Sequence, residues 1–119
     1  MPYRSHVDSL TKIMDNLSHE DAIILVEGKR DYKALANLGI PKERIVQCAQ
    51  RAERDLEPII MTHPTKAIPL FDNDTTGKLR SSRFCRYFNG QIPIDYSYSQ
   101  RLFRLGLTYI EELNNRMLR

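Results

Sequence analysis

Acidic side chains follow two short apolar runs, and their types and spacing could do chemistry. Residues 22–26 lead into the first group and residues 67–71 into the second; the groups are Glu27, Gly28 and Asp31, then Asp72 and Asp74. A β-rich run that ends in a carboxylate is how an open α/β sheet presents ligand-binding groups. Carboxylates gathered at one sheet edge repel each other unless a hard cation lies between them. Mg²⁺, or Mn²⁺ in its place, suits a few carboxylates with water and substrate phosphates, so the spacing predicts metal-assisted phosphate chemistry.

Short strands must position these carboxylates. β-rich runs predict strands at residues 22–26, 44–48, 67–71 and 92–95. Pro69 lies inside the third of these runs, and proline cannot donate a hydrogen bond to a sheet ladder. Either this strand is irregular or the Pro69 nitrogen faces an unpaired gap.

Helices are expected between the strands. Residues 3–17 form an amphipathic pattern, a short helix ends at Gly39, residues 75–88 form a longer helix, and residues 109–117 are the clearest helical part of the C-terminal region. The apolar faces expected are Val7, Leu10, Met14 and Leu17; Tyr32, Leu35 and Ala36; Ala52, Leu56, Ile59, Ile60 and His63; and Ser81, Phe84, Cys85 and Phe88.

The alternation of strands and helices predicts an α/β fold with a parallel sheet of about four strands and helices on both faces. If the first and third strands are neighbours, Glu27 meets Asp72 and Asp74 at the point where such sheets bind ligands. The 119 residues fit one domain, 1–119, with a core at about 21–95 and flanking helices at both ends.

The pattern E-G-x-x-D after one strand and D-x-D after another resembles the Toprim domain of topoisomerases, bacterial-type primases, OLD-family nucleases and 5S ribosomal RNA maturation ribonucleases. The matching residues are Glu27, Gly28, Asp31, Asp72 and Asp74, with Gly77 and Lys78 following as in many members. The chain is most similar to small stand-alone, primase-like Toprim proteins of archaea and bacteria. The resemblance implies a Toprim fold in which Glu27 is the general acid or base and the two aspartates hold Mg²⁺.

The residue types suit these roles. Asp72 and Asp74 are two residues apart, so on an extended backbone their side chains leave on the same side and can share one ion. Glu27 on a neighbouring strand can reach the attacking or leaving oxygen, and Gly28 has no Cβ to obstruct a phosphate. Asp31 supports the metal site in this interpretation, or else it caps the following helix.

Residues 72–77 also allow other interpretations. Asp72 to Gly77 is ordinary turn and helix-cap chemistry, which remains an alternative. The opening D-x-D-x-x-G is typical of a calcium loop, but Arg83 stands where the bidentate glutamate belongs. Gly77-Lys78 is not a P-loop, because Asp72 occupies the position of its first glycine.

Basic side chains flank both acidic groups and are candidates for phosphate binding. Lys29 lies beside Glu27, and Lys78, Arg80 and Arg83 lie in the helix that starts beside Asp74. Lysine and arginine neutralise phosphates and release counterions, although an ordinary charged helix face explains any single arginine equally well. Gly28 and Gly77 complete the expected phosphate-binding set.

Charge is distributed unevenly along the chain. Residues 1–77 carry 10 Lys/Arg against 12 Asp/Glu, and residues 78–119 carry 8 against 3. An acidic half beside a basic half suits a polyanion such as RNA or DNA, or else reflects a solvated basic surface. No apolar run is long enough to span a bilayer and the N-terminus has no signal-peptide core, so we expect a cytoplasmic protein without a membrane partner.

Other reactive side chains are expected to be structural. Cys48 and Cys85 are far apart, so we expect reduced, largely buried thiols. Tyr96 and Tyr98, and the scattered histidines His6, His19 and His63, are interpreted as structural or solvated.

Two functions therefore compete. The first is a Mg²⁺-dependent nuclease that hydrolyses phosphodiesters, with Glu27 as general acid or base. The second is a nucleic-acid-binding or assembly module that binds metal but turns over little. Because a chain of this size offers little surface for a long substrate, a homodimer or a larger protein partner fits either function.

Overall fold

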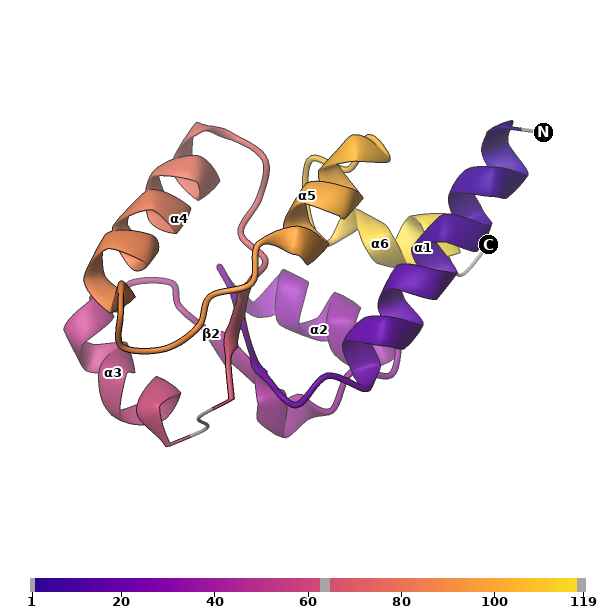
Figure 1. Cartoon of the computed structure of the whole chain (residues 1–119). Coiled ribbons are helices and arrows are strands. Elements are labelled where there is room, and N and C mark those ends of the chain that lie inside the picture. The colour runs from indigo at the N-terminus through magenta and orange to yellow at the C-terminus, as the bar shows by residue number, and fades with distance from the viewer. Residues whose placement is uncertain (1, 63–64, 118–119) are drawn as a thin grey trace.

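Helices and short strands alternate along the chain (Figure 1). The computed structural model describes residues 2–62 and 65–117, with side chains from residue 9 onwards. The expected positions of Val7, His6 and His63 therefore lie outside the described side chains. The elements are α1 (Pro2–Ser18), β1 (Ile23–Val26), α2 (Lys29–Asn37), a 3-10 turn η1 (Lys42–Arg44), β2 (Ile45–Gln47), α3 (Glu53–Met61), β3 (Ala67–Pro69), α4 (Thr75–Phe88), α5 (Ser97–Arg104) and α6 (Glu112–Met117).

The described strands form a parallel three-stranded sheet in the order β2-β1-β3. β1 is central and β3 is its neighbour, so the condition under which Glu27 meets Asp72 and Asp74 is fulfilled. The helices that leave β1 and β3, α2 and α4, pack on opposite faces of the sheet. The crevice at the carboxyl ends of β1 and β3 is thus the kind of place where open α/β sheets bind ligands.

The prediction of a fourth strand at residues 92–95 was wrong. Only an isolated parallel bridge joins Ala67 to Ile94, through hydrogen bonds from Ala67 N to Pro93 O and from Asp95 N to Ala67 O, each 2.9 Å long. The next donor on that side of β3 is the nitrogen of Pro69, which carries no hydrogen, so the ladder cannot continue. The Pro69 nitrogen therefore faces away from β1 towards an unpaired gap, which was one of the two alternatives for this strand.

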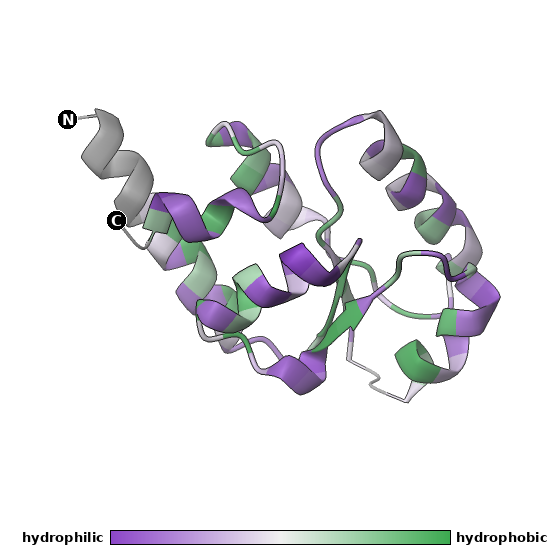
Figure 2. Ribbon diagram, turned by 180° about the vertical axis from the view of Figure 1, so that it is seen from behind, coloured by the Kyte–Doolittle hydropathy of each residue, from purple (hydrophilic) through white to green (hydrophobic). Residues whose placement is uncertain are grey.

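Alternate residues of β1 feed two separate apolar cores. Ile24 and Val26 pack with α1, α2, α5 and α6, whereas Ile23 and Leu25 pack with α3 and α4. Figure 2 shows the hydrophobic strands between these two layers of helices. Strands buried on both faces read as continuous apolar runs, which is why residues 22–26 show no polar alternation. Helices on both faces are thus confirmed.

The buried face of α4 differs from the one expected. Gly77, Arg80, Phe84 and Phe88 are buried, Ser81 is half-buried, and Cys85 is exposed. The buried face of α4 therefore runs through Arg80, and Ser81 lies at the border of this face. The prediction that Ser81 and Cys85 are buried was wrong, although the bounds of the helix were as expected.

Smaller differences concern α3 and the C-terminal region. Leu56 and Ile60 are buried in α3 as expected, but Ala52 and Ile59 are exposed. Residues 97–104 form a helix, α5, that the sequence pattern did not separate from the following one. In the described part of the chain, no helix has the length and apolar character needed to cross a bilayer.

Candidate metal and phosphate site

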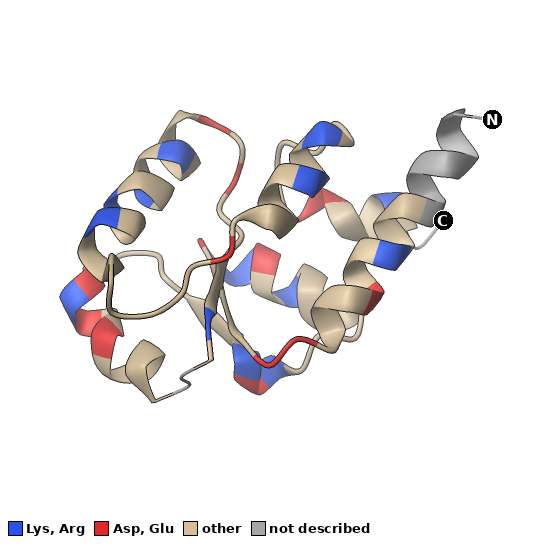
Figure 3. Cartoon of the chain, in the orientation of Figure 1, with Lys and Arg blue, Asp and Glu red and all other residues tan. Residues whose placement is uncertain are grey.

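The carboxyl ends of β1 and β3 bring the two acidic groups to one edge of the sheet. Glu27 directly follows β1, and Asp72 and Asp74 lie in the loop between β3 and α4. Figure 3 shows acidic positions in that loop and near the end of β1. This edge is where the sequence predicted a metal site.

Backbone N–H groups orient three of these carboxylates. Gly28 N donates to Asp31 Oδ2 at 3.2 Å, Ile110 N donates to Asp72 Oδ1 at 2.9 Å, and Gly77 N donates to Asp74 Oδ1 at 2.8 Å. Asp31 and Asp74 thus cap α2 and α4, which agrees with the alternative interpretation of these residues as helix caps. The second oxygen of each aspartate accepts no hydrogen bond from another described residue and is left for a further partner.

Burial and mutual repulsion raise the pKa values of two carboxylates at this edge. Burial raises the pKa of Asp31 from 3.8 to about 6, with further increases from the charges of Asp72, Glu111 and Glu27. Burial likewise raises the pKa of Asp72, to which the charges of Asp74, Glu111 and Glu27 add, while the hydrogen bond from Ile110 lowers it. No ion pair joins Asp31 or Asp72 to another described residue, and a bound cation would supply the compensating charge.

Glu111 belongs to the acidic group but was not among the residues predicted. It precedes α6, which packs against α2, and its carboxylate lies 3.9 Å from the guanidinium of Arg30. Its sequence signal is weak: Glu111 and Glu112 are two of the three acidic residues in an otherwise basic C-terminal stretch. Only packing of α6 brings Glu111 to this edge.

The donor set fits a divalent cation bound through few protein ligands. Glu27 Oε2 is buried and has no hydrogen-bond partner among the described residues. An orphaned carboxylate oxygen beside raised-pKa aspartates favours a cation. No group of three or more described His, Cys, Asp and Glu side chains is arranged to hold one ion. Mg²⁺ takes one or two carboxylates with waters and substrate phosphates, so a pair of these oxygens is sufficient.

The two glycines of the expected phosphate site have different surroundings. A Cβ at Gly77 would lie 1.9 Å from the Asp72 carbonyl oxygen, so only glycine lets α4 start this close to the loop. A Cβ at Gly28 would meet nothing within 4 Å. The packing of the loop therefore requires glycine at position 77, whereas the space beside Gly28 is open to a ligand.

The basic residues divide into exposed and buried ones. Lys29, Lys78 and Arg83 are exposed, and no hydrogen bond or ion pair joins their side chains to another described residue. Arg80 differs from the expectation, because it is only 6% exposed. Its Nε lies 3.4 Å from Glu53 Oε1 and its Nη2 donates to Arg51 O at 2.7 Å. Its guanidinium joins α4 to α3 and does not face a ligand.

The cysteines and tyrosines have structural surroundings. Cys48 is buried and free, and burial raises the pKa of its thiol to about 12. Cys85 is also free but exposed, so the expectation of two buried thiols was wrong for Cys85. Tyr98 donates to Glu20 Oε2 at 2.6 Å, and Tyr96 donates to Ser81 O at 3.3 Å.

Comparison with known proteins gives two similar chains. No family model matches. The chain is 28% identical over 100 residues to UPF0292 protein PF1724 of Pyrococcus furiosus, covering 84% of this chain and 75% of that protein. It is also similar to a protein of known structure from Aquifex aeolicus, with a TM-score of 0.78 and 27% identity over 85% of this chain and 94% of the other. Neither name states an activity, but the second likeness shows that this chain shares its α/β arrangement with that structure.

Proposed function

We propose that the protein is a Mg²⁺-dependent nuclease of the Toprim type that hydrolyses phosphodiester bonds in RNA or DNA. One observation carries the proposal. Asp31, Asp72 and Asp74 are each oriented by one backbone N–H and keep a free oxygen, at a sheet edge where Glu27 has an orphaned buried oxygen. Carboxylate oxygens that are held in place and left without a partner at one sheet edge suit a divalent cation.

Each residue has a distinct role in this proposal. Asp72 and Asp74, supported by Asp31, would hold Mg²⁺, and Mn²⁺ is the substitute to test. The bound ion supplies charge stabilisation for the phosphoryl oxygens. Glu27 would take the proton from the attacking water, whose oxygen bonds to phosphorus, or give a proton to the oxygen that leaves. Lys29, Lys78 and Arg83 would hold the flanking phosphates.

The Toprim assignment rests on two features together. The E-G-x-x-D residues follow the central strand β1, and the D-x-D residues follow its neighbour β3. That order supports the resemblance, although the sheet has three strands and not the four expected. A nucleic-acid substrate agrees with our expectation of a cytoplasmic location.

A cleavage assay tests the proposal directly. Labelled RNA and DNA are incubated with the purified protein in Mg²⁺, in Mn²⁺ and in EDTA, beside Glu27→Gln and Asp72→Asn variants. We expect cleavage with either metal, none in EDTA, and loss of at least about a hundredfold in both variants. Equal activity in the variants and the wild type would identify a contaminating nuclease and refute the catalytic assignment.

A second function has its own support. Asp31 and Asp74 cap helices, and no three described metal-binding side chains are grouped, which agrees with a binding or assembly module of low turnover. Nucleic-acid binding that persists without cleavage in all metals would favour this module. A homodimer or a complex with a larger protein partner would fit either function, and light scattering measures which of them forms.

A further inference from the structure

A groove leads away from the acidic site between α4 and α5. Its volume is about 390 Å³, within the range of roughly 300–1,000 Å³ typical of ligand pockets. Asp72 and Asn73 line the end of this groove that belongs to the loop after β3. The groove therefore adjoins the proposed metal site and shares Asp72 with it.

Polar side chains at helical spacing form both walls. The α4 wall consists of Lys78, Ser81, Ser82 and Cys85, and the α5 wall of Tyr96, Ser99, Gln100 and Phe103. The side chains of Asn73, Ser82 and Gln100 make no hydrogen bond to another described residue, so their donors and acceptors are free. A row of unused amide and hydroxyl groups suits a ligand with many hydrogen-bonding edges.

Phe103 adds a flat apolar surface to this polar groove. Its ring is only partly buried against the core of α1, α5 and α6. Aromatic rings on which bases stack, beside side chains that bond base edges, are the usual means of holding unpaired nucleotides. Among the described residues that line the groove, Lys78 is the one cation, so stacking and hydrogen bonds, more than charge, would hold a ligand there.

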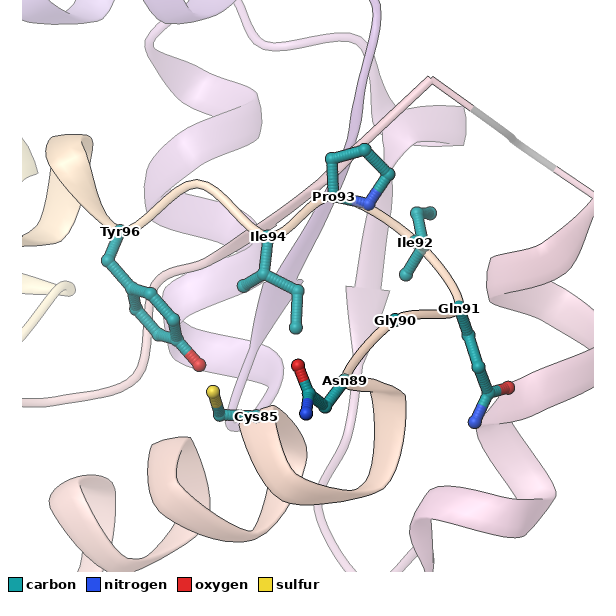
Figure 4. Close-up of a pocket in the computed structure, with 8 residues that line it drawn as sticks. All are labelled: Cys85, Asn89, Gly90, Gln91, Ile92, Pro93, Ile94 and Tyr96. Carbon is teal, nitrogen blue, oxygen red and sulfur yellow. The ribbon is translucent and has the colours of Figure 1, made fainter.

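A neighbouring hollow lies beside the groove. A second hollow of about 490 Å³ shares Cys85 and Tyr96 with it and is bounded by residues 89–94. Figure 4 shows the Tyr96 hydroxyl directed towards the Cys85 sulfur where the two hollows meet, with Asn89 beside them. The two hollows therefore lie next to each other along α4, on either side of these two side chains.

We propose that the groove between α4 and α5 holds an unpaired nucleotide next to the bond that is cleaved, so that the substrate is single-stranded nucleic acid. This inference rests on the proposed function and names its substrate class. The base stacks on Phe103, and Asn73, Ser82 and Gln100 bond its edges or its sugar. A duplex keeps its bases inside and cannot place one there.

Binding measured without turnover tests the groove. Fluorescence anisotropy in EDTA compares a short labelled single strand, the same strand in a duplex, and adenosine monophosphate as a competitor. We expect the single strand to bind at least about tenfold more tightly than the duplex, and the mononucleotide to compete poorly. Equal binding of the duplex would overturn the proposal, and so would a mononucleotide that binds as tightly as the strand.

Two variants and one control localise the binding. Ser82→Phe fills the groove, and Phe103→Leu removes the stacking ring while keeping an apolar side chain against the core. Each should weaken single-strand binding by about tenfold with an unchanged melting temperature. Leu79→Phe is the control, because Leu79 is 62% exposed on the same helix and does not line the groove. Unchanged binding in both groove variants would refute the site.

The outcome is distinguishable from failure of the nuclease proposal. Single-strand binding in EDTA with no cleavage in Mg²⁺ would support the groove proposal and refute the hydrolytic activity. Metal-dependent cleavage of both single strand and duplex, with no preference in binding, would support the activity and refute the groove proposal.

Discussion

At the scale of single residues, the site combines structural and chemical demands on the same side chains. Asp31 and Asp74 cap helices through one oxygen, and Asp72 accepts a hydrogen bond from Ile110. Each cap fixes the direction in which the other oxygen points. Such carboxylates cost stability while they remain uncompensated, which makes the cost measurable.

Asp31→Asn should stabilise the metal-free protein. Its carboxyl has a pKa of about 6 in the folded state, above the ordinary 3.8, chiefly because it is buried. A raised folded pKa means that stability increases as pH falls, because the folded state binds more protons than the unfolded one. In EDTA we expect a gain of about 1–2 kcal/mol near pH 7.5, after discounting for solvent screening.

Urea unfolding from about pH 7.5 to pH 5.5 checks this. The gain should shrink towards the lower pH, because wild-type Asp31 itself becomes protonated there. The asparagine keeps an oxygen that can accept from Gly28 N, so the helix cap is retained. A gain that does not depend on pH, or a loss of stability, would show that the charge of Asp31 is not the cause.

Alanine at the two glycines should give opposite results. Gly77→Ala places a Cβ 1.9 Å from the Asp72 carbonyl oxygen, so the loop or the start of α4 must move. We expect a loss of more than about 2 kcal/mol in thermal or urea unfolding. Gly28→Ala meets nothing within 4 Å and should change stability by less than about 0.5 kcal/mol, while reducing cleavage if a phosphate occupies that space. Equal stability losses would contradict this difference.

At the scale of elements, α4 separates stability from binding. Its inward face carries Arg80, paired with Glu53 of α3, and Phe84 and Phe88, whose ring centroids are 4.6 Å apart. Its outward face carries the exposed Arg83, and a third face lines the groove. α4 thus contributes to the apolar core that it shares with α3, to the groove and, through its Asp74 cap, to the acidic site.

Arg80→Ala should destabilise the protein by about 3 kcal/mol, because it leaves the largely buried carboxylate of Glu53 without its partner. Arg83→Ala, three residues along, is the matched control and should change stability by less than about 0.5 kcal/mol. Urea unfolding measures both. Combining Arg80→Ala with Glu53→Gln should recover part of the loss; additive losses would mean that the two side chains do not interact.

At the scale of the whole molecule, the charge of the chain is divided. Residues 78–119 carry 8 Lys/Arg against 3 Asp/Glu, and the acidic site belongs mainly to the first part of the sequence. Figure 3 shows basic positions along α4 and α5, the two helices whose side chains line the groove. This arrangement draws a polyanion towards the acidic site, where Arg30 pairs with Glu111.

Binding of a single strand should therefore weaken as salt increases. Between about 50 and 200 mM salt, log K should fall linearly with log salt concentration, and Arg83→Ala should reduce the slope by about 0.7 if Arg83 contacts one phosphate. Lys42→Ala is the control, because Lys42 precedes β2 and lies at the opposite edge of the sheet. Anisotropy titrations give the slopes; an equal change in both variants would indicate a general charge effect.

The sequence by itself determined the local features. The apolar run of β1, the helix from Thr75 to Phe88 and the acids that follow β1 and β3 were all predicted, because they depend on neighbouring residues and on helix and strand periods. Only the tertiary structure decided that Arg80 is buried and Cys85 exposed, since several registers of one amphipathic helix fit the same pattern. It also decided that Pro69 limits pairing with residues 93–95, and that α6 brings Glu111 to the acidic site. Those outcomes depend on contacts between segments far apart in the chain, which local propensity does not encode.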